Sequence, residues 1–302
     1  MPSRRSFFHT FILLLILAFF FTTVSLLILK KRSLSLSISN KIGVIPIEGV
    51  ISDAMTITKY IEKFRKDDSI KAIIIRINSP GGSVAPTQEI YREIRKTIKK
   101  KKVIASIGGV GASGAYYIAS AANKIVANPG TITGSIGVIM DFIQIRELLN
   151  KLGIKLSALK SGKFKDIGAP YREMTEEEKK LIMDMLMEVK EQFVQAVARG
   201  RHIPVEKVEK IADGRILLGS QAKRLGLVDQ LGNFQDAVEL AKKMAHIKGS
   251  VKLVYPRADG ISFLNRLIDG AVHRLLLYTS FPILEYNFSF PTQNRLRTIM
   301  LD

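Results

Sequence analysis

The segment Ala72–Ser83 has the sequence AIIIRINSPGGS, an apolar run of strand length that ends in two adjacent glycines. A short isoleucine-rich run bounded by turn residues is typical of a buried strand. A helical pattern follows at about Pro86–Lys100, so the segment predicts a strand that turns directly into a helix. The paired glycines fit either a tight turn that needs a positive φ or a cradle of backbone N–H groups for an anion or oxyanion.

The same alternation of apolar runs and helix-period segments continues on both sides of this segment. Further strands are expected at Gly43–Ile47, Val103–Ile107, Lys124–Ala127 and Ile136–Met140. Further helices are expected at about Met55–Arg65, Phe142–Leu152, Met174–Arg201 and Asn233–Ala245. This order indicates a layered α/β fold with buried, largely parallel strands. With 302 residues, 47% of them hydrophobic, the chain is long enough for one large domain or two small ones.

The amino-terminal segment Phe7–Leu29 is apolar and carries no charge at neutral pH. As a helix it is long enough to cross a hydrocarbon core of about 30 Å. The run leads straight into Lys30–Arg32 instead of a small-x-small cleavage site, so we expect an uncleaved membrane anchor rather than a signal peptide. Arg4 and Arg5 on one side are balanced by Lys30–Arg32 on the other, so charge alone leaves the orientation open.

Composition excludes several classes of function. The formal net charge of +19 is spread along the chain with few aromatic residues between the basic ones, which disfavours nucleic-acid binding and favours proximity to a membrane. The absence of cysteine excludes disulfides, thiolate metal sites and a cysteine nucleophile. We expect no metal ion and no cofactor.

A second glycine-rich turn, Gly109–Tyr117, has the sequence GVGASGAYY and follows the strand expected at Val103–Ile107. Ser113 should therefore lie where a strand turns into a helix, with its hydroxyl at the positive end of the helix dipole. Taken alone, such a turn serves close packing more often than catalysis. Its glycine spacing also matches the dinucleotide fingerprint, but no acidic residue follows between Glu93 and Asp141 to bind a ribose, which argues against a nucleotide site.

A serine nucleophile needs a base, and the four histidines give little support for a triad. His9 lies in the apolar amino-terminal segment, and the others lie far downstream: His202, His246 and His273. A lysine serves instead when burial favours its neutral amine. The loop at 160–165 offers three such lysines, Lys160, Lys163 and Lys165, and the chemistry alone does not choose among them.

Together these segments resemble signal peptide peptidase A, also called protease IV, in its short, single-repeat, membrane-anchored form. The resemblance spans about Lys41–Ala245. It rests on Asn78–Ser83, Ala112–Ala119, Thr133–Gly137, Lys163–Ile167 and the run from Asp213 to Asp229. It implies that Ser113 is the nucleophile, Lys165 the general base and Ser135 the hydroxyl that orients the lysine. It also places the backbone N–H groups of Gly82 and Gly114 in the oxyanion hole.

The resemblance further implies a fold like that of Clp protease and crotonase, built of stacked ββα units, in subunits that form a homo-oligomeric ring. Neighbouring subunits would contribute to each active site. The expected organisation is a cytoplasmic stub and transmembrane anchor at 1–32, a peptidase domain at 33–255, and a carboxyl-terminal helix and tail at 256–302. The catalytic domain would lie on the outer side of the plasma (inner) membrane and degrade cleaved signal peptides there.

Three alternatives share part of this pattern. A crotonase-like acyl-CoA enzyme would have the same fold and oxyanion hole, although such enzymes commonly use carboxylates. A protease directed at stomatin-like membrane proteins would share Ser113 and Lys165. A non-catalytic scaffold of the same fold would tolerate alanine at both positions. Hydrolysis of a peptide without coenzyme A separates the first alternative from a peptidase, and substrate profiling separates the second.

Overall fold

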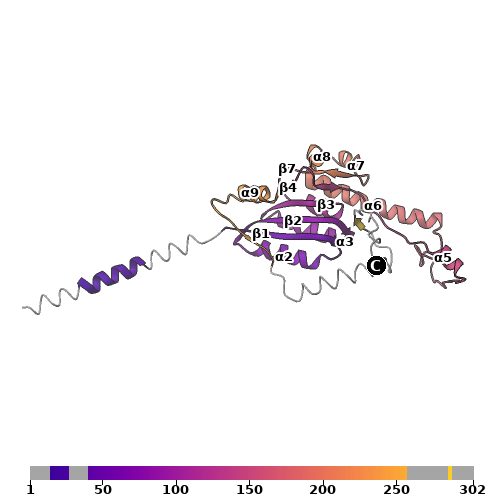
Figure 1. Cartoon of the computed structure of the whole chain (residues 1–302), viewed down its shortest axis with the longest axis horizontal. Helices are drawn as coiled ribbons and strands as arrows, with labels where there is room; N and C mark the ends of the chain where they lie inside the picture. Colours follow the sequence, from indigo (N-terminus) through magenta and orange to yellow (C-terminus); the bar gives the residue numbers. More distant parts are fainter. Residues whose placement is uncertain (1–13, 27–39, 257–284, 288–302) are drawn as a thin grey trace, which may run out of the picture.

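A nine-stranded sheet forms the centre of the fold (Figure 1). The computed structural model describes residues 14–26, 40–256 and 285–287. The strands are β1 (Lys41–Ile51), β2 (Ile70–Ser83), β3 (Lys102–Ala112), β4 (Lys124–Ala127), β5 (Ile132–Gly134), β6 (Ile216–Leu218), β7 (Gln230–Leu231), β8 (Lys252–Val254) and β9 (Glu285–Asn287). The main path through the sheet is β6-β5-β3-β2-β1-β8.

The central strands are parallel, as the alternation of elements predicts. β1 pairs with β2 and β8, and β2 pairs with β3, all in parallel. Two strands follow one another along β3: β4 pairs with its first half and β5 with its second half. Antiparallel pairing is confined to β5 with β6 and to β2 with β9. The carboxyl ends of β2, β3 and β5 therefore meet at one edge of the sheet.

Helices cover both faces of this sheet. The helices of residues 40–256 are α2 (Met55–Lys66), α3 (Val84–Thr97), α4 (Gly114–Ser120), α5 (Arg146–Lys151), α6 (Glu176–Arg201), α7 (Val205–Glu209), α8 (Gly219–Arg224) and α9 (Phe234–Met244). Isoleucines at alternate positions of β2 explain the two layers. Ile73 and Ile75 pack in the larger core with α2, α3, α4 and α6, whereas Ile74 packs in a smaller core with α9. The isoleucine run is continuous because both sides of the strand are buried.

Helix α6 is only partly packed against the domain. Its buried apolar residues begin at Phe193, and the Phe193 ring lies 4.9 Å from the ring of Tyr117 in α4, measured between centroids. Gly200 permits this approach, because a Cβ there would lie 2.0 Å from the carbonyl oxygen of Ser120. The amino-terminal half of α6 extends away from the sheet with α5 at its far end, and α5 has no buried residue (Figure 1). We call residues 138–187 the arm.

The helix starts were well predicted where capping residues are present. Asn233 caps α9 through its side chain, and Thr175 forms a capping box with Glu178 at the start of α6. The strand predicted at Ile136–Met140 is wrong, because the strand in this region is β5 at Ile132–Gly134. Gly134 and Ser135 both have positive φ values, 75° and 50°, which turn the chain away from the sheet before the apolar run begins.

The predicted membrane anchor is not confirmed. Residues 14–26 are helical and expose apolar side chains such as Phe19 and Phe21. Within the described residues no helix combines the length and the apolar composition needed to span a bilayer. The expected span Phe7–Leu29 lies partly outside those residues. The apolar pattern assigns the expected carboxyl-terminal helix to Ile261–Leu277, which lies wholly outside them.

Candidate active site

Ser113 lies at the junction between β3 and α4, where the sequence places it. It is the N-cap residue of α4, and its backbone has φ 53° and ψ −121°. An L-residue adopts this conformation only when its surroundings impose it, and such strain is concentrated at functional sites. A sharp strand-to-helix turn of this kind presents the nucleophile in serine hydrolases of another fold. The hydroxyl does not cap the helix, and the residue is only 1% exposed.

The two predicted oxyanion-hole glycines lie at the ends of adjacent strands. Gly114 is the first residue of α4, where backbone N–H groups have no partner within the helix. Gly82 ends the pairing of β2 with β1, opposite Ile51. A Cβ on Gly82 would lie 2.2 Å from the carbonyl oxygen of Ile51, and its φ is +155°, so only glycine fits there. The structure thus brings both glycines to the edge of the sheet that carries Ser113.

Ser135 lies beside Ser113 at this edge. In the pairing of β3 with β5, Ala112 is opposite Gly134. Ser113 and Ser135 directly follow these two residues, at the ends of the two strands. The backbone N–H of Ser113 donates a hydrogen bond of 2.8 Å to the carbonyl oxygen of Gly134. Both serines are buried. The structure therefore assembles the predicted nucleophile with the predicted lysine-orienting hydroxyl.

The three candidate lysines differ in their contacts. Lys160 forms an ion pair with Asp166 at 2.5 Å, and Lys163 forms one with Glu177. The side chain of Lys165 is exposed, and within the described part of the chain it has neither an ion pair nor a side-chain hydrogen bond. Of the three lysines, Lys165 is therefore the one without a carboxylate partner among the described residues.

The lysine loop is fixed to the start of α6 by Arg172. The guanidinium donates to both carboxylate oxygens of Asp166, at 2.8 and 2.9 Å, and to both oxygens of Glu178, at 2.6 and 2.8 Å. These contacts lower the pKa of Glu178 to about 2 and hold the pKa of Asp166 well below its ordinary range. Bidentate pairs of this kind are the geometrically specific form of ion pair.

Within the described residues no hydrogen bond joins Lys165 to Ser113. The loop is attached at Glu178, whereas α4 packs against α6 at Phe193, fifteen residues further on. At the rise of an α-helix this separation is about 22 Å. Lys165 lies in the arm, and Ser113 lies at the edge of the sheet, at the start of α4.

We predict that Arg172→Met frees the lysine loop and lowers peptide hydrolysis roughly tenfold or more, because misplacing a catalytic group is costly. Arg146→Met is the matched control, since Arg146 makes a single exposed ion pair with Glu173 on the same arm. Limited proteolysis between residues 160 and 172 measures the release directly. Wild-type resistance to proteolysis and wild-type activity in Arg172→Met would contradict this assignment.

The pH dependence of this attachment follows from the lowered carboxyl pKa values. A lowered carboxyl pKa contributes stability that is present above the ordinary value, 4.5 for Glu178, and is lost as the pH falls towards about 2. The loop of the wild-type chain should therefore resist proteolysis equally at pH 7 and pH 5. A marked increase in cleavage already at pH 5 would show that the Arg172 pairs do not hold the loop.

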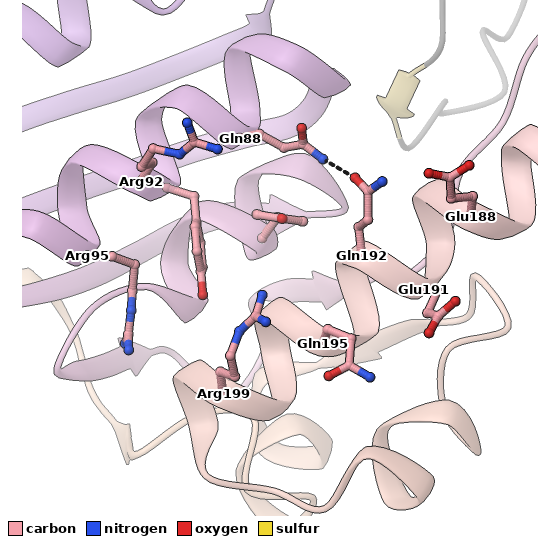
Figure 2. A pocket seen from close by; sticks show the side chains of 10 residues that line it. Gln88, Arg92, Arg95, Glu188, Glu191, Gln192, Gln195 and Arg199 are labelled. Carbon is pink, nitrogen blue, oxygen red and sulfur yellow. Dashed lines mark hydrogen bonds between the residues drawn. The ribbon is translucent and has the colours of Figure 1, made fainter.

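A pocket lies on the helical face of the domain, apart from the catalytic edge. Its volume is about 480 Å³, and none of the predicted site residues lines it. Figure 2 shows Gln88 of α3 and Gln192 of α6 facing each other, joined by a hydrogen bond of 2.8 Å. Tyr117 also lines it, and burial raises the pKa of this phenol to about 12. The Tyr117 N–H donates to the Ser113 carbonyl oxygen, so the pocket adjoins α4 without including Ser113.

One feature of the site was missed by sequence reasoning. β9 pairs antiparallel with the end of β2, so that Tyr286 is opposite Gly82 and its two neighbours are opposite Gly81 and Ser83. Addition of an extended segment to a sheet edge is a general mode of peptide recognition. The segment carries no periodicity or motif from which this pairing could be read. The edge beside Ser113 thus accepts an extended backbone.

The chain is similar to known peptidases. The family model of peptidase family S49 matches residues 95–248 of the chain, and the family model of Clp protease matches residues 36–131. A Synechocystis protein named as a protease is 42% identical over 211 residues, which are 69% of this chain and 76% of that protein. An Enterococcus faecium protein named as a signal peptide peptidase SppA is 35% identical over 232 residues, 72% of this chain and 67% of that protein.

Protease 4 of Haemophilus influenzae is 30% identical over 266 residues, which are 82% of this chain but only 43% of that protein. The S49 match covers more than half of the 302 residues. The chain belongs to peptidase family S49, whose Clp protease-like α/β fold it has.

Proposed function

We propose that this chain is a membrane-anchored serine endopeptidase with a Ser/Lys dyad that degrades cleaved signal peptides and other hydrophobic peptides. The observation that carries the proposal is the strained backbone of Ser113, buried at the carboxyl edge of the sheet beside Ser135. Membership in family S49 supports a peptidase, and the name of the Enterococcus faecium relative supports signal peptides as substrates.

The chemistry proposed for the site is acyl transfer to serine. The Ser113 hydroxyl attacks the scissile carbonyl while the neutral amine of Lys165 takes its proton. The backbone N–H groups of Gly82 and Gly114 donate to the oxyanion of the tetrahedral intermediate. Lys165 returns the proton to the departing amine, and a water molecule then hydrolyses the acyl-enzyme with Lys165 again acting as base. Ser135 holds the amine in position throughout.

Lys165 would come from a neighbouring copy in a homo-oligomeric ring. In one chain Lys165 is exposed on the arm, and no described hydrogen bond joins it to Ser113. The arm also exposes large apolar side chains, among them Leu148, Leu152, Leu159, Met183 and Met187. Apolar surface of this extent is typical of an interaction site. A ring in which each arm covers the next copy would bury this surface and bring each Lys165 to a neighbouring Ser113.

The substrate would bind as an extended strand. Pairing of β9 with Gly81–Ser83 supports this, because a peptide in the same place would lie along the oxyanion-hole glycines beside Ser113. The anchor at Phe7–Leu29 would hold the enzyme at the plasma (inner) membrane, with the amino terminus in the cytoplasm and the catalytic domain on the outer side. Hydrophobic peptides released into the bilayer would then be close to the site.

The experiment that tests this function uses the full chain in detergent with synthetic signal peptides, followed by mass analysis of the products. We expect cleavage within the apolar stretch, without added coenzyme A and without loss of activity in a chelator. Turnover of an acyl-CoA thioester with no peptide cleavage would favour the crotonase-like alternative. Cleavage restricted to stomatin-like membrane proteins would move the assignment to the other protease class.

A further inference from the structure

The turn Asp213–Arg215 lies against the active-site edge and has no role in the chemistry above. One carboxylate oxygen of Asp213 accepts the backbone N–H of Arg215 at 3.1 Å. The same carboxylate accepts the Arg215 Nε at 2.8 and 2.9 Å through its two oxygens. Gly214 between them has φ +84°, which the turn requires. The Asp213 side chain therefore closes this turn on itself.

The closed turn bonds to the backbone on both sides of Ser135. The Ser135 N–H donates to the Arg215 carbonyl oxygen at 2.8 Å, and the Gly214 N–H donates to the Ile136 carbonyl oxygen at 3.1 Å. The two segments are also in contact, since a Cβ on Gly137 would lie 3.3 Å from the Cα of Gly214. Two backbone hydrogen bonds, one at Ser135 and one at Ile136, thus connect this segment to the turn.

Ser135 needs this support because of its backbone. Its φ of 50° follows a Gly134 φ of 75°, and a left-handed conformation persists in an L-residue only where neighbouring groups hold it. The Gly134 carbonyl oxygen accepts the N–H of Ser113 at 2.8 Å. A change in the backbone of Ser135 would therefore reach Ser113 through this hydrogen bond.

We propose that Asp213 is a positioning residue that holds the Arg215 carbonyl against Ser135, so that the Ser135 hydroxyl is aimed at the catalytic lysine amine. The inference rests on the proposed function, because it gives Ser135 the lysine-orienting role. Asp213 itself touches neither substrate nor reacting atoms. The Arg215 guanidinium holds the pKa of Asp213 well below its ordinary range, so the carboxylate stays charged throughout the pH range of a peptidase assay.

Two substitutions distinguish the contribution of the turn hydrogen bond from that of the ion pair with Arg215. Asp213→Ala removes both the turn acceptor and the partner of Arg215. Asp213→Asn keeps an oxygen that accepts the Arg215 N–H, as asparagine does in turns of this kind. We expect Asp213→Ala to lower kcat roughly tenfold to a hundredfold with little change in KM, and Asp213→Asn to restore most of the loss.

The control is Asp67→Ala. Asp67 closes a similar turn by accepting the Ser69 N–H at 2.9 Å and its hydroxyl at 2.7 Å. That turn precedes β2, at the opposite edge of the sheet, so its loss should leave kcat unchanged. A fall in kcat in Asp67→Ala as large as that in Asp213→Ala would make the effect one of general stability and would overturn the positioning role.

The decisive measurement is a double-mutant cycle with Ser135→Ala in the full chain. If Asp213 acts through Ser135, Asp213→Ala costs much less than tenfold in the Ser135→Ala background. The pH midpoint of kcat should also move in Asp213→Ala, because the hydrogen bond between the Ser135 hydroxyl and the catalytic lysine amine changes. Equal losses in both backgrounds with an unmoved pH profile would overturn the proposal. Failure of the proposed function looks different: the wild type itself would show no Ser113-dependent peptide hydrolysis.

Discussion

Replacing Ser113 with alanine is expected to reduce peptide hydrolysis by the full chain about 10⁴-fold or more, because it removes the atom that forms the acyl-enzyme. The fold should survive, since the Ser113 hydroxyl does not cap α4. Thermal unfolding of the variant checks this, and turnover of a signal peptide gives the rate. Retention of more than a small fraction of wild-type activity would show that another group is the nucleophile.

Ser120→Ala is the matched control for this prediction. Ser120 lies in the same helix, is buried, and donates its hydroxyl to the Tyr117 carbonyl oxygen at 2.6 Å. It lies at the end of α4 that packs on Gly200, away from the sheet edge. Its removal tests whether loss of any buried serine in α4 impairs the enzyme, and we expect it to retain most of the activity.

The second prediction concerns the separation of Ser113 and Lys165 in one chain. Ser113→Ala and Lys165→Ala should each be inactive alone, and their co-assembly should restore activity. If each site takes Ser113 from one copy and Lys165 from the next, random mixing in equal amounts gives about a quarter of the wild-type sites in a closed ring. Co-expression with two affinity tags, followed by sequential purification and assay, measures this fraction.

Lys163→Ala is the control for the lysine variant. Lys163 lies on the same loop and pairs with Glu177 on the surface, a contact that contributes little to stability. It should leave activity unchanged. A mixed assembly with no activity, formed from a wild type that is active, would show that both dyad residues are needed in the same chain. An active Lys165→Ala would remove this lysine from the mechanism altogether.

Local signals made much of the fold predictable. The apolar run in β2 predicts a strand buried on two faces, and Asn233 and Thr175 predict helix starts that the structure confirms. These features depend on neighbours in the sequence, such as an N-cap side chain and the N–H groups two or three residues later. The same holds for the position of Ser113 at the end of β3.

Contacts between distant segments were not predictable in this way. The apolar residues of Ile136–Met140 suggest a strand, but the left-handed turn at Ser135 is held by Arg215, about eighty residues away. The pairing of β9 with β2 likewise has no local pattern. The position of Lys165 depends on the length of α6, whose unpacked half separates it from Ser113.

The most direct test of the central claim is a reaction of the full wild-type chain with a serine-directed fluorophosphonate, followed by intact-mass analysis and peptide mapping. The account predicts one adduct per chain, on Ser113, that is absent in Ser113→Ala and strongly slowed in Lys165→Ala. An adduct on a different serine, or no adduct on a wild-type chain that cleaves peptides, would contradict it.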